Sequence, residues 1–222
     1  MKTWGLDMLR RMMGAWVALA LVLMAPVAMA QQGGALSPDL AREFINKLGQ
    51  RTLAVLQSAS MPPQQRSAEI GRILLDGMDF DIVSMHTLGR FGRRPDSKEF
   101  REFSLLFSAY IIDLAVEKFG SLPVQSYTIN SASALPNGDV TVYTTVVPDG
   151  GQSLSAGWRV RGTAAGPKII DILVDGYSMT THFNGQYQDW LSKAGLEGLV
   201  TKMRGQTRNS PSLVLVRSVR GG

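Results

Sequence analysis

The chain has 222 residues, with 23 basic and 18 acidic side chains, two histidines and no cysteine. Without cysteine it forms neither a disulfide nor a lipoprotein anchor, and His86 and His182 alone give no ligand spacing for a metal site. The small, dispersed basic excess argues against a nucleic-acid-binding surface, and the length suits a single domain with room for a core and a cavity.

Residues 1–30 have the pattern of a secretory signal peptide. Basic residues near the start precede 19 uncharged residues, and the segment ends in Ala28-Met29-Ala30. An uncleaved membrane anchor is the alternative, because the uncharged run approaches the length of a bilayer span; Pro26 and the small residues favour cleavage. Cleavage after Ala30 removes three basic residues and one acidic residue. The mature chain then has 20 basic and 17 acidic residues, and a net charge of +3. We therefore expect a mature protein in the periplasm.

The first half of the mature chain has helical periodicity. Start signals stand at Ser37-Pro38, Pro62-Pro63 and Asp96-Ser97, each before apolar residues three or four apart. Four helices are predicted, over residues 38–56, 63–78, 82–88 and 98–120. The last carries a strict stripe of Phe100, Phe103, Phe107, Tyr110 and Leu114. Such a stripe either packs as core or lines a ligand cavity, and periodicity alone does not separate the two.

The second half alternates between apolar and polar residues, which predicts four strands over residues 124–129, 140–147, 152–161 and 168–174. Short turns rich in glycine, proline, asparagine and aspartate make them antiparallel neighbours. Within 152–161 one face is apolar, since Leu154, Ala156, Trp158 and Val160 point the same way. Helices followed by a meander predict an α+β domain with helices covering the apolar face of the sheet.

The chain closes with a Gly176-Tyr177-Ser178 turn and an aromatic helix that begins at Met179. A break is expected at Ala194-Gly195, followed by a second short helix over 196–203. Residues 206–222 stay unassigned as a C-terminal tail, in which 212–220 is a candidate strand.

The order and separation of several motifs resemble the MlaC family, also called the toluene-tolerance auxiliary proteins. The first motif is Phe80-Asp81 followed by Leu88-Gly89. The second is the aromatic stripe of the helix that follows, from Phe100 to Tyr110. The third is the closing strand, the Gly176-Tyr177-Ser178 turn and the aromatic helix after it. The resemblance covers most of residues 36–204. It implies an NTF2-like fold, in which N-terminal helices pack on a curved antiparallel sheet of about four strands and C-terminal helices close an apolar cavity, over a lipid-binding domain of residues 31–205.

The resemblance also implies a function. Members of the family are periplasmic phospholipid carriers that serve lipid transport and outer-membrane lipid asymmetry. The expected partners are a phospholipid ligand, an inner-membrane MCE-domain ABC transporter and an outer-membrane lipoprotein complex, with transient membrane-surface contact and no cofactor. A hopanoid-associated relative of the same family is the alternative.

Two sets of site residues are expected. The candidates for the cavity are Phe103, Phe107, Tyr110, Leu114, Val142, Leu154, Trp158, Ile172, Met179, Phe183 and Tyr187. A cluster of Arg90, Arg93 and Arg94 is a candidate for a phosphate headgroup or an acidic partner surface, because guanidinium groups bind phosphate oxygens in pairs; the alternative is a solvated loop.

An enzyme is the distant alternative, and no catalytic residue is predicted. Ser178 lies in a sequence that resembles a nucleophile elbow, but no acid stands between it and His182, the only later histidine. Asp79 reads better as a helix cap than as an acid–base partner of Asp81. An NTF2-like enzyme would need only one or two buried polar groups, with Asp113 or Tyr110 as candidates.

Overall fold

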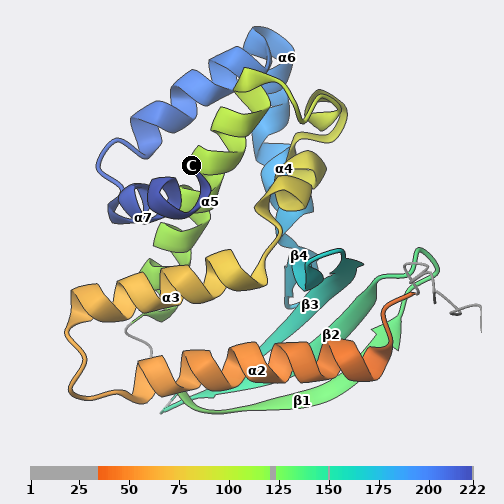
Figure 1. Ribbon diagram of the computed structural model, residues 1–222, viewed down its shortest axis with the longest axis vertical. Helices are drawn as coiled ribbons and strands as arrows, with labels where there is room; N and C mark the ends of the chain where they lie inside the picture. The colour runs from red at the N-terminus through yellow and green to blue at the C-terminus, as the bar shows by residue number, and fades with distance from the viewer. Residues whose placement is uncertain (1–34, 121–123, 150, 222) are drawn as a thin grey trace, which may run out of the picture. The chain divides into compact units, whose positions relative to one another are not determined.

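The computed structural model describes residues 35–120, 124–149 and 151–221, so the predicted signal peptide lies outside the described residues. Figure 1 shows how the elements are arranged. The helices are α2 (Pro38–Gln57), α3 (Pro63–Gly77), α4 (Phe80–Leu88), the 3-10 turn η1 (Gly89–Gly92), α5 (Lys98–Phe119), α6 (Met179–Gln206) and α7 (Pro211–Arg220). The strands are β1 (Val124–Ala134), β2 (Val140–Pro148), β3 (Leu154–Thr163), β4 (Gly166–Val174) and β5 (Tyr177–Ser178).

The helix starts follow the predicted capping residues. The Ser37 hydroxyl accepts a hydrogen bond from the amide of Leu40 at 3.2 Å, and the Ser97 hydroxyl caps α5 in the same way. The Asp79 carboxylate accepts from the amide of Ile82 at 3.0 Å at the start of α4. The structural interpretation of Asp79 is confirmed, because this carboxylate satisfies a backbone donor that the first turn of the helix leaves open.

The strands form one antiparallel meander in the order β1-β2-β3-β4-β5, which confirms the predicted α+β class. The four predicted strands are present, and β1 runs further than expected, to Ala134. The fifth strand is only two residues long and follows a tight turn in which Asp175 and Gly176 both have positive φ. The sheet curves behind α2, which runs along β1, as Figure 1 shows.

Helices α4, α5, α6 and α7 pack together beyond α3 (Figure 1). The predicted break in α6 is confirmed at Gly195, whose φ of 64° and ψ of −168° interrupt the helical path. Because such a backbone conformation strains any residue with a Cβ, glycine suits this position. The chain can therefore turn sharply between the two halves of α6.

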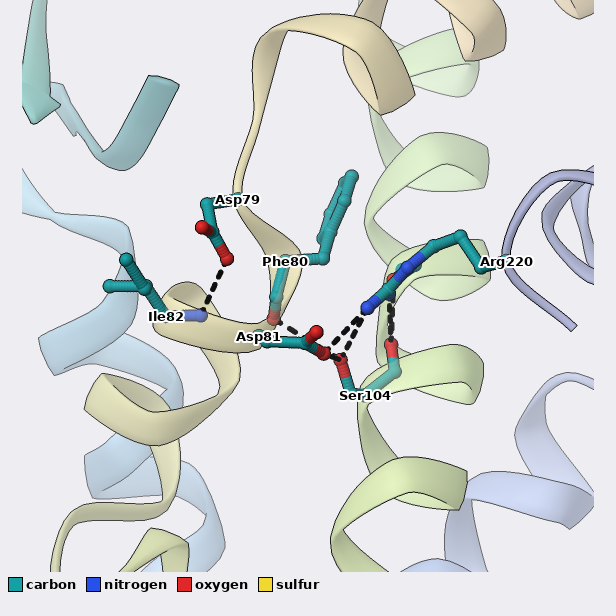
Figure 2. A network of polar contacts seen from close by, with 7 residues as sticks. Asp79, Phe80, Asp81, Ile82, Ser104 and Arg220 are labelled. Atoms are coloured by element: carbon teal, nitrogen blue, oxygen red, sulfur yellow. Dashed lines mark hydrogen bonds and ion pairs between the residues drawn. The ribbon is translucent and has the colours of Figure 1, made fainter. Parts of the chain in front are cut away.

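The candidate strand in residues 212–220 is wrong, because the segment forms helix α7. The Ser210 hydroxyl caps it through the amide of Leu213 at 3.1 Å, and Val216 is fully buried. Figure 2 shows Arg220 reaching from α7 to Asp81 and Ser104. The apolar run Leu213 to Val216 is compatible with a helix or a strand, but the start signal Ser210-Pro211 and the packing of the segment against α5 both favour the helix.

Hydropathy gives one further result. None of the helices within the described residues is both long and apolar enough to cross a membrane.

Candidate functional site

An apolar cavity of about 260 Å³ lies between α2, α3, the C-terminal end of α5 and one face of the sheet. Helices α2 and α3 supply ten of its 24 lining residues, and strands β1 to β4 supply eleven. The lining residues are Ile45, Leu48, Gly49, Thr52, Leu53, Leu56, Ile70, Ile73, Leu74, Gly77, Met78, Ala115, Phe119, Val124, Tyr127, Thr144, Val146, Leu154, Ser155, Ala156, Trp158, Ile169, Ile172 and Val174.

None of these described lining residues carries a charge, and most of their polar groups are already paired. The Thr52 hydroxyl donates to the carbonyl of Leu48 at 2.9 Å, and the indole of Trp158 donates to the Thr144 hydroxyl at 2.9 Å. The Tyr127 hydroxyl lies 2.8 Å from the carbonyl oxygen of Asn46. A wall whose polar groups are satisfied internally presents hydrocarbon to its contents, so the cavity suits an apolar ligand.

The cavity is not sealed. Phe119 and Val174 line it and are 44% and 47% exposed to solvent. They come from the C-terminal ends of α5 and β4. This end of the cavity is therefore accessible from outside and is bordered by apolar side chains.

The structure places three of the eleven predicted cavity residues in the lining: Leu154, Trp158 and Ile172. All three lie on β3 and β4 and point to the same face of the sheet. The two-residue period of a strand places such residues on one face of the sheet.

The predicted aromatic residues lie elsewhere. Phe103, Phe107, Tyr110, Phe183 and Tyr187 pack against one another between α5 and α6, with ring centroids 5.2 Å apart for Phe103 and Phe107 and 5.4 Å apart for Phe107 and Phe183. Phe103 and Phe107 are fully buried, and burial raises the pKa of the Tyr187 hydroxyl. The stripe of α5 faces α6 instead of the sheet, so these rings fill a packed core.

The remaining three candidates also lie outside the lining of this cavity. Val142 is fully buried in the core, and Leu114 and Met179 are half-buried and pack against it. The apolar faces of α2 and α3 line the cavity instead, and they were not among the predicted residues. Those faces have ordinary helical spacing, which is the same signal that a packed core gives.

The arginine cluster lies away from the cavity. Arg90 is in η1, with its guanidinium 4.9 Å from the centroid of the Phe91 ring, and Arg93 and Arg94 are exposed in the segment before α5. The cavity contacts α5 at Ala115 and Phe119, near its other end. At 1.5 Å per residue, about 25 Å of helix separates the two.

The enzyme candidates do not come together. The Ser178 hydroxyl donates to Asp171 at 2.6 Å and caps α6, and His182 contacts Gln186 on the next turn. Asp113 accepts from the amide of Ser212 at 3.3 Å, while Tyr110 belongs to the aromatic core. Within residues 35–120, 124–149 and 151–221, no three acidic, histidine or cysteine side chains are grouped to hold a metal ion.

Two comparisons with known proteins give matches. A family model described as MlaC protein matches residues 23–205. The structure of a phospholipid-binding protein from Ralstonia solanacearum in complex with a phospholipid superposes with a TM-score of 0.67 at 19% sequence identity, covering 76% of this chain and 97% of that chain. No curated protein sequence matches the chain.

Proposed function

This chain belongs to the MlaC family, and on that premise we propose that it is a periplasmic carrier that holds phospholipid acyl chains in the cavity between α2, α3 and the sheet. The solved structure that it resembles is of a protein with a bound phospholipid, which supports the same ligand class.

The single observation that carries the proposal is the uncharged lining of the cavity, with most of its polar groups paired to the protein itself. A two-tailed phospholipid exposes roughly 30 methylenes on leaving a bilayer, and at about 0.8 kcal/mol each this opposes desorption by more than 20 kcal/mol. A carrier must offset most of that free energy with apolar contact. A wall without charges, and with most of its polar groups paired, provides such contact at little desolvation cost.

We infer that loading widens the cavity, because two acyl chains with roughly 30 methylenes need more space than about 260 Å³ provides. Helices α2 and α3 form much of this wall, and the exposed ion pair between Arg51 and Asp76, 3.1 Å long, contributes little to holding them together.

The carrier would transfer lipid between the inner-membrane MCE-domain ABC transporter and the outer-membrane lipoprotein complex. The predicted signal peptide supports a periplasmic location. The distance of Arg90, Arg93 and Arg94 from the cavity favours contact with an acidic partner over contact with the lipid. Being exposed, the three guanidinium groups are available for such a surface.

The test is the identity of the bound molecule. Protein purified from the periplasm is extracted with organic solvent, and the extract is analysed by mass spectrometry. We expect phospholipid at up to one molecule per protein. Recovery of a hopanoid would instead favour the hopanoid-associated alternative, and an extract without lipid would contradict the carrier function.

A pair of variants locates the lipid. Ile172→Asp places a charge in the cavity wall, where the open space admits water, whereas Val142→Asp places it in the packed core of β2. We expect the first variant to stay folded and lose most of its lipid, and the second to unfold. If the first variant kept its lipid, the chains would be bound elsewhere.

A further inference from the structure

The accessible end of the cavity has an exposed apolar border. Phe119 of α5 and Val174 of β4 both line the cavity and are exposed to solvent there. Tyr177 of β5 is paired directly with Val174 in the antiparallel sheet, so the two side chains project from the same face. Tyr177 is 81% exposed, the highest value among the large hydrophobic side chains of the described residues. We call Phe119, Val174 and Tyr177 the rim.

The turn before Tyr177 holds its side chain outward. Asp175-Gly176 is a two-residue hairpin turn in which both residues have positive φ, a geometry that this pair of residues favours. The amide of Asp175 donates to the carbonyl of Ser155 at 3.1 Å, and the Ser178 hydroxyl donates to Asp171 at 2.6 Å. The chain is fixed on both sides of Tyr177, so the exposure of this tyrosine is built into the fold.

We propose that the rim docks on the surface of a zwitterionic phospholipid bilayer, so that the cavity takes up and releases acyl chains by direct contact with the membrane. This rests on the carrier function proposed above. With the rim at the bilayer surface, the chains pass into the cavity over apolar side chains, and their methylenes are not exposed to water on the way.

The size of the rim favours a bilayer over a protein partner. An aromatic side chain offers about 150 to 250 Å², so the exposed parts of Phe119 and Tyr177 together amount to roughly 200 to 300 Å². A stable protein interface buries about 800 Å² on each partner, more than half of it apolar. A bilayer needs no complementary surface. Tyrosine suits its boundary, where one end of the side chain meets apolar chains and the other stays in water.

The charges beside the rim favour a neutral membrane. Glu117 and Lys118, which precede Phe119 in the chain, form an ion pair at 2.8 Å, so their charges cancel. Asp175, between Val174 and Tyr177, is exposed and adds one negative charge. An anionic bilayer has a negative surface potential, which repels this carboxylate. Apolar contact with zwitterionic lipid is therefore the interaction that the rim is suited to make.

The experiment is lipid transfer between vesicles with no other protein present. Full-length mature protein is mixed with phosphatidylcholine donor vesicles that contain a fluorescent phosphatidylcholine and a quencher that stays in the donor, and with unlabelled phosphatidylcholine acceptors. The rise in fluorescence gives the transfer rate. We expect this rate to increase in proportion to the acceptor concentration, because each delivery requires contact with a vesicle. Added phosphatidylglycerol should not increase the rate, and added salt should not lower it.

Two substitutions test the rim itself. Tyr177→Asp should lower the transfer rate about tenfold, the effect of losing partial burial of one large apolar side chain on docking. Tyr177→Trp should keep the wild-type rate, because tryptophan also suits a bilayer surface. Both variants should hold as much lipid at equilibrium as wild type and unfold at the same temperature, because Tyr177 lies outside the lining of the cavity.

The matched control is Val214→Asp, which introduces the same charge at a side chain of α7 that is 76% exposed and outside the lining of the cavity. It should leave the rate unchanged. The docking would be overturned by a wild-type rate for Tyr177→Asp, by an equal loss in Val214→Asp, or by less lipid bound to Tyr177→Asp at equilibrium. A rate independent of the acceptor concentration would overturn it too.

The docking and the carrier function can fail separately. Wild type that carries lipid when purified but exchanges none with protein-free vesicles would overturn the docking on a bilayer and leave the carrier function standing, with a protein partner at the rim. Wild type that carries no lipid when purified and takes none from vesicles would overturn both.

Discussion

Two alanines on α5 allow the cavity to be tested against the core with one identical substitution. Ala115 lines the cavity, whereas Ala109, less than two turns earlier, is fully buried in the packed core. Ala115→Leu adds three carbons to the wall of a cavity of about 260 Å³. Those carbons leave water for apolar contact worth up to about 2.4 kcal/mol, less about 0.5 to 1 kcal/mol of side-chain entropy.

Ala115→Leu should therefore stabilise the delipidated protein by about 1.5 kcal/mol, or about 3 to 6 °C in Tm, and lower its lipid content. Ala109→Leu should destabilise it by about 1 to 3 kcal/mol, because the same carbons force apart side chains that already touch. Differential scanning calorimetry and the lipid-to-protein ratio measure both effects. If Ala115→Leu destabilised the protein as much as Ala109→Leu does, the space between α2, α3 and the sheet would not be open, and the reasoning for a carrier would fail.

Three further predictions concern processing, pH and the C-terminal helix. Protein recovered from the periplasm should begin at Gln31, and an intact Met1 in washed membranes would contradict the signal peptide. Burial alone would raise the pKa of Asp139, but its paired hydrogen bonds with Arg161, 2.7 and 2.9 Å long, hold that pKa below its usual 3.8. The pair therefore adds stability above about pH 4 that is lost as the pH falls through the folded pKa, and Asp139→Asn should flatten the loss of urea stability on acidification. Arg220→Ala removes contacts to Asp81 and to the Ser108 hydroxyl and should cost about 1 to 2 kcal/mol in urea unfolding; an unchanged midpoint would make these contacts energetically neutral.

Most of the fold could be predicted from local signals. Caps at Ser37, Asp79 and Ser97 and the break at Gly195 all lie where side-chain chemistry and backbone freedom require them. These signals act over three or four residues, so the sequence displays them directly. Helix α7 was missed although Ser210-Pro211 is a start signal of the same kind as Ser37-Pro38, because the apolar run Leu213 to Val216 that follows it fits a strand as well as a helix.

The site was harder to predict than the fold. Of the residues expected in the cavity, Leu154, Trp158 and Ile172 lie in its lining, because a strand presents alternate residues to one face and the sequence displays that period. It could not tell the aromatic stripe of α5, which packs against α6, from the plainer apolar faces of α2 and α3, which surround open space. A cavity is a property of how far apart elements stand, and aromatic side chains fill space as readily as they border it.

The position of α7 bears on how the protein should be produced and handled. The MlaC family model ends at residue 205, so a chain trimmed to that boundary would lose Val216 and leave the faces of α3 and α5 around Gly71 and Ile112 open to water. Such a truncated chain is expected to aggregate, or to stick to detergent and lipid for reasons unrelated to its cargo. Because Arg220 is anchored on Asp81 and Ser108, an affinity tag fused after it needs a flexible spacer.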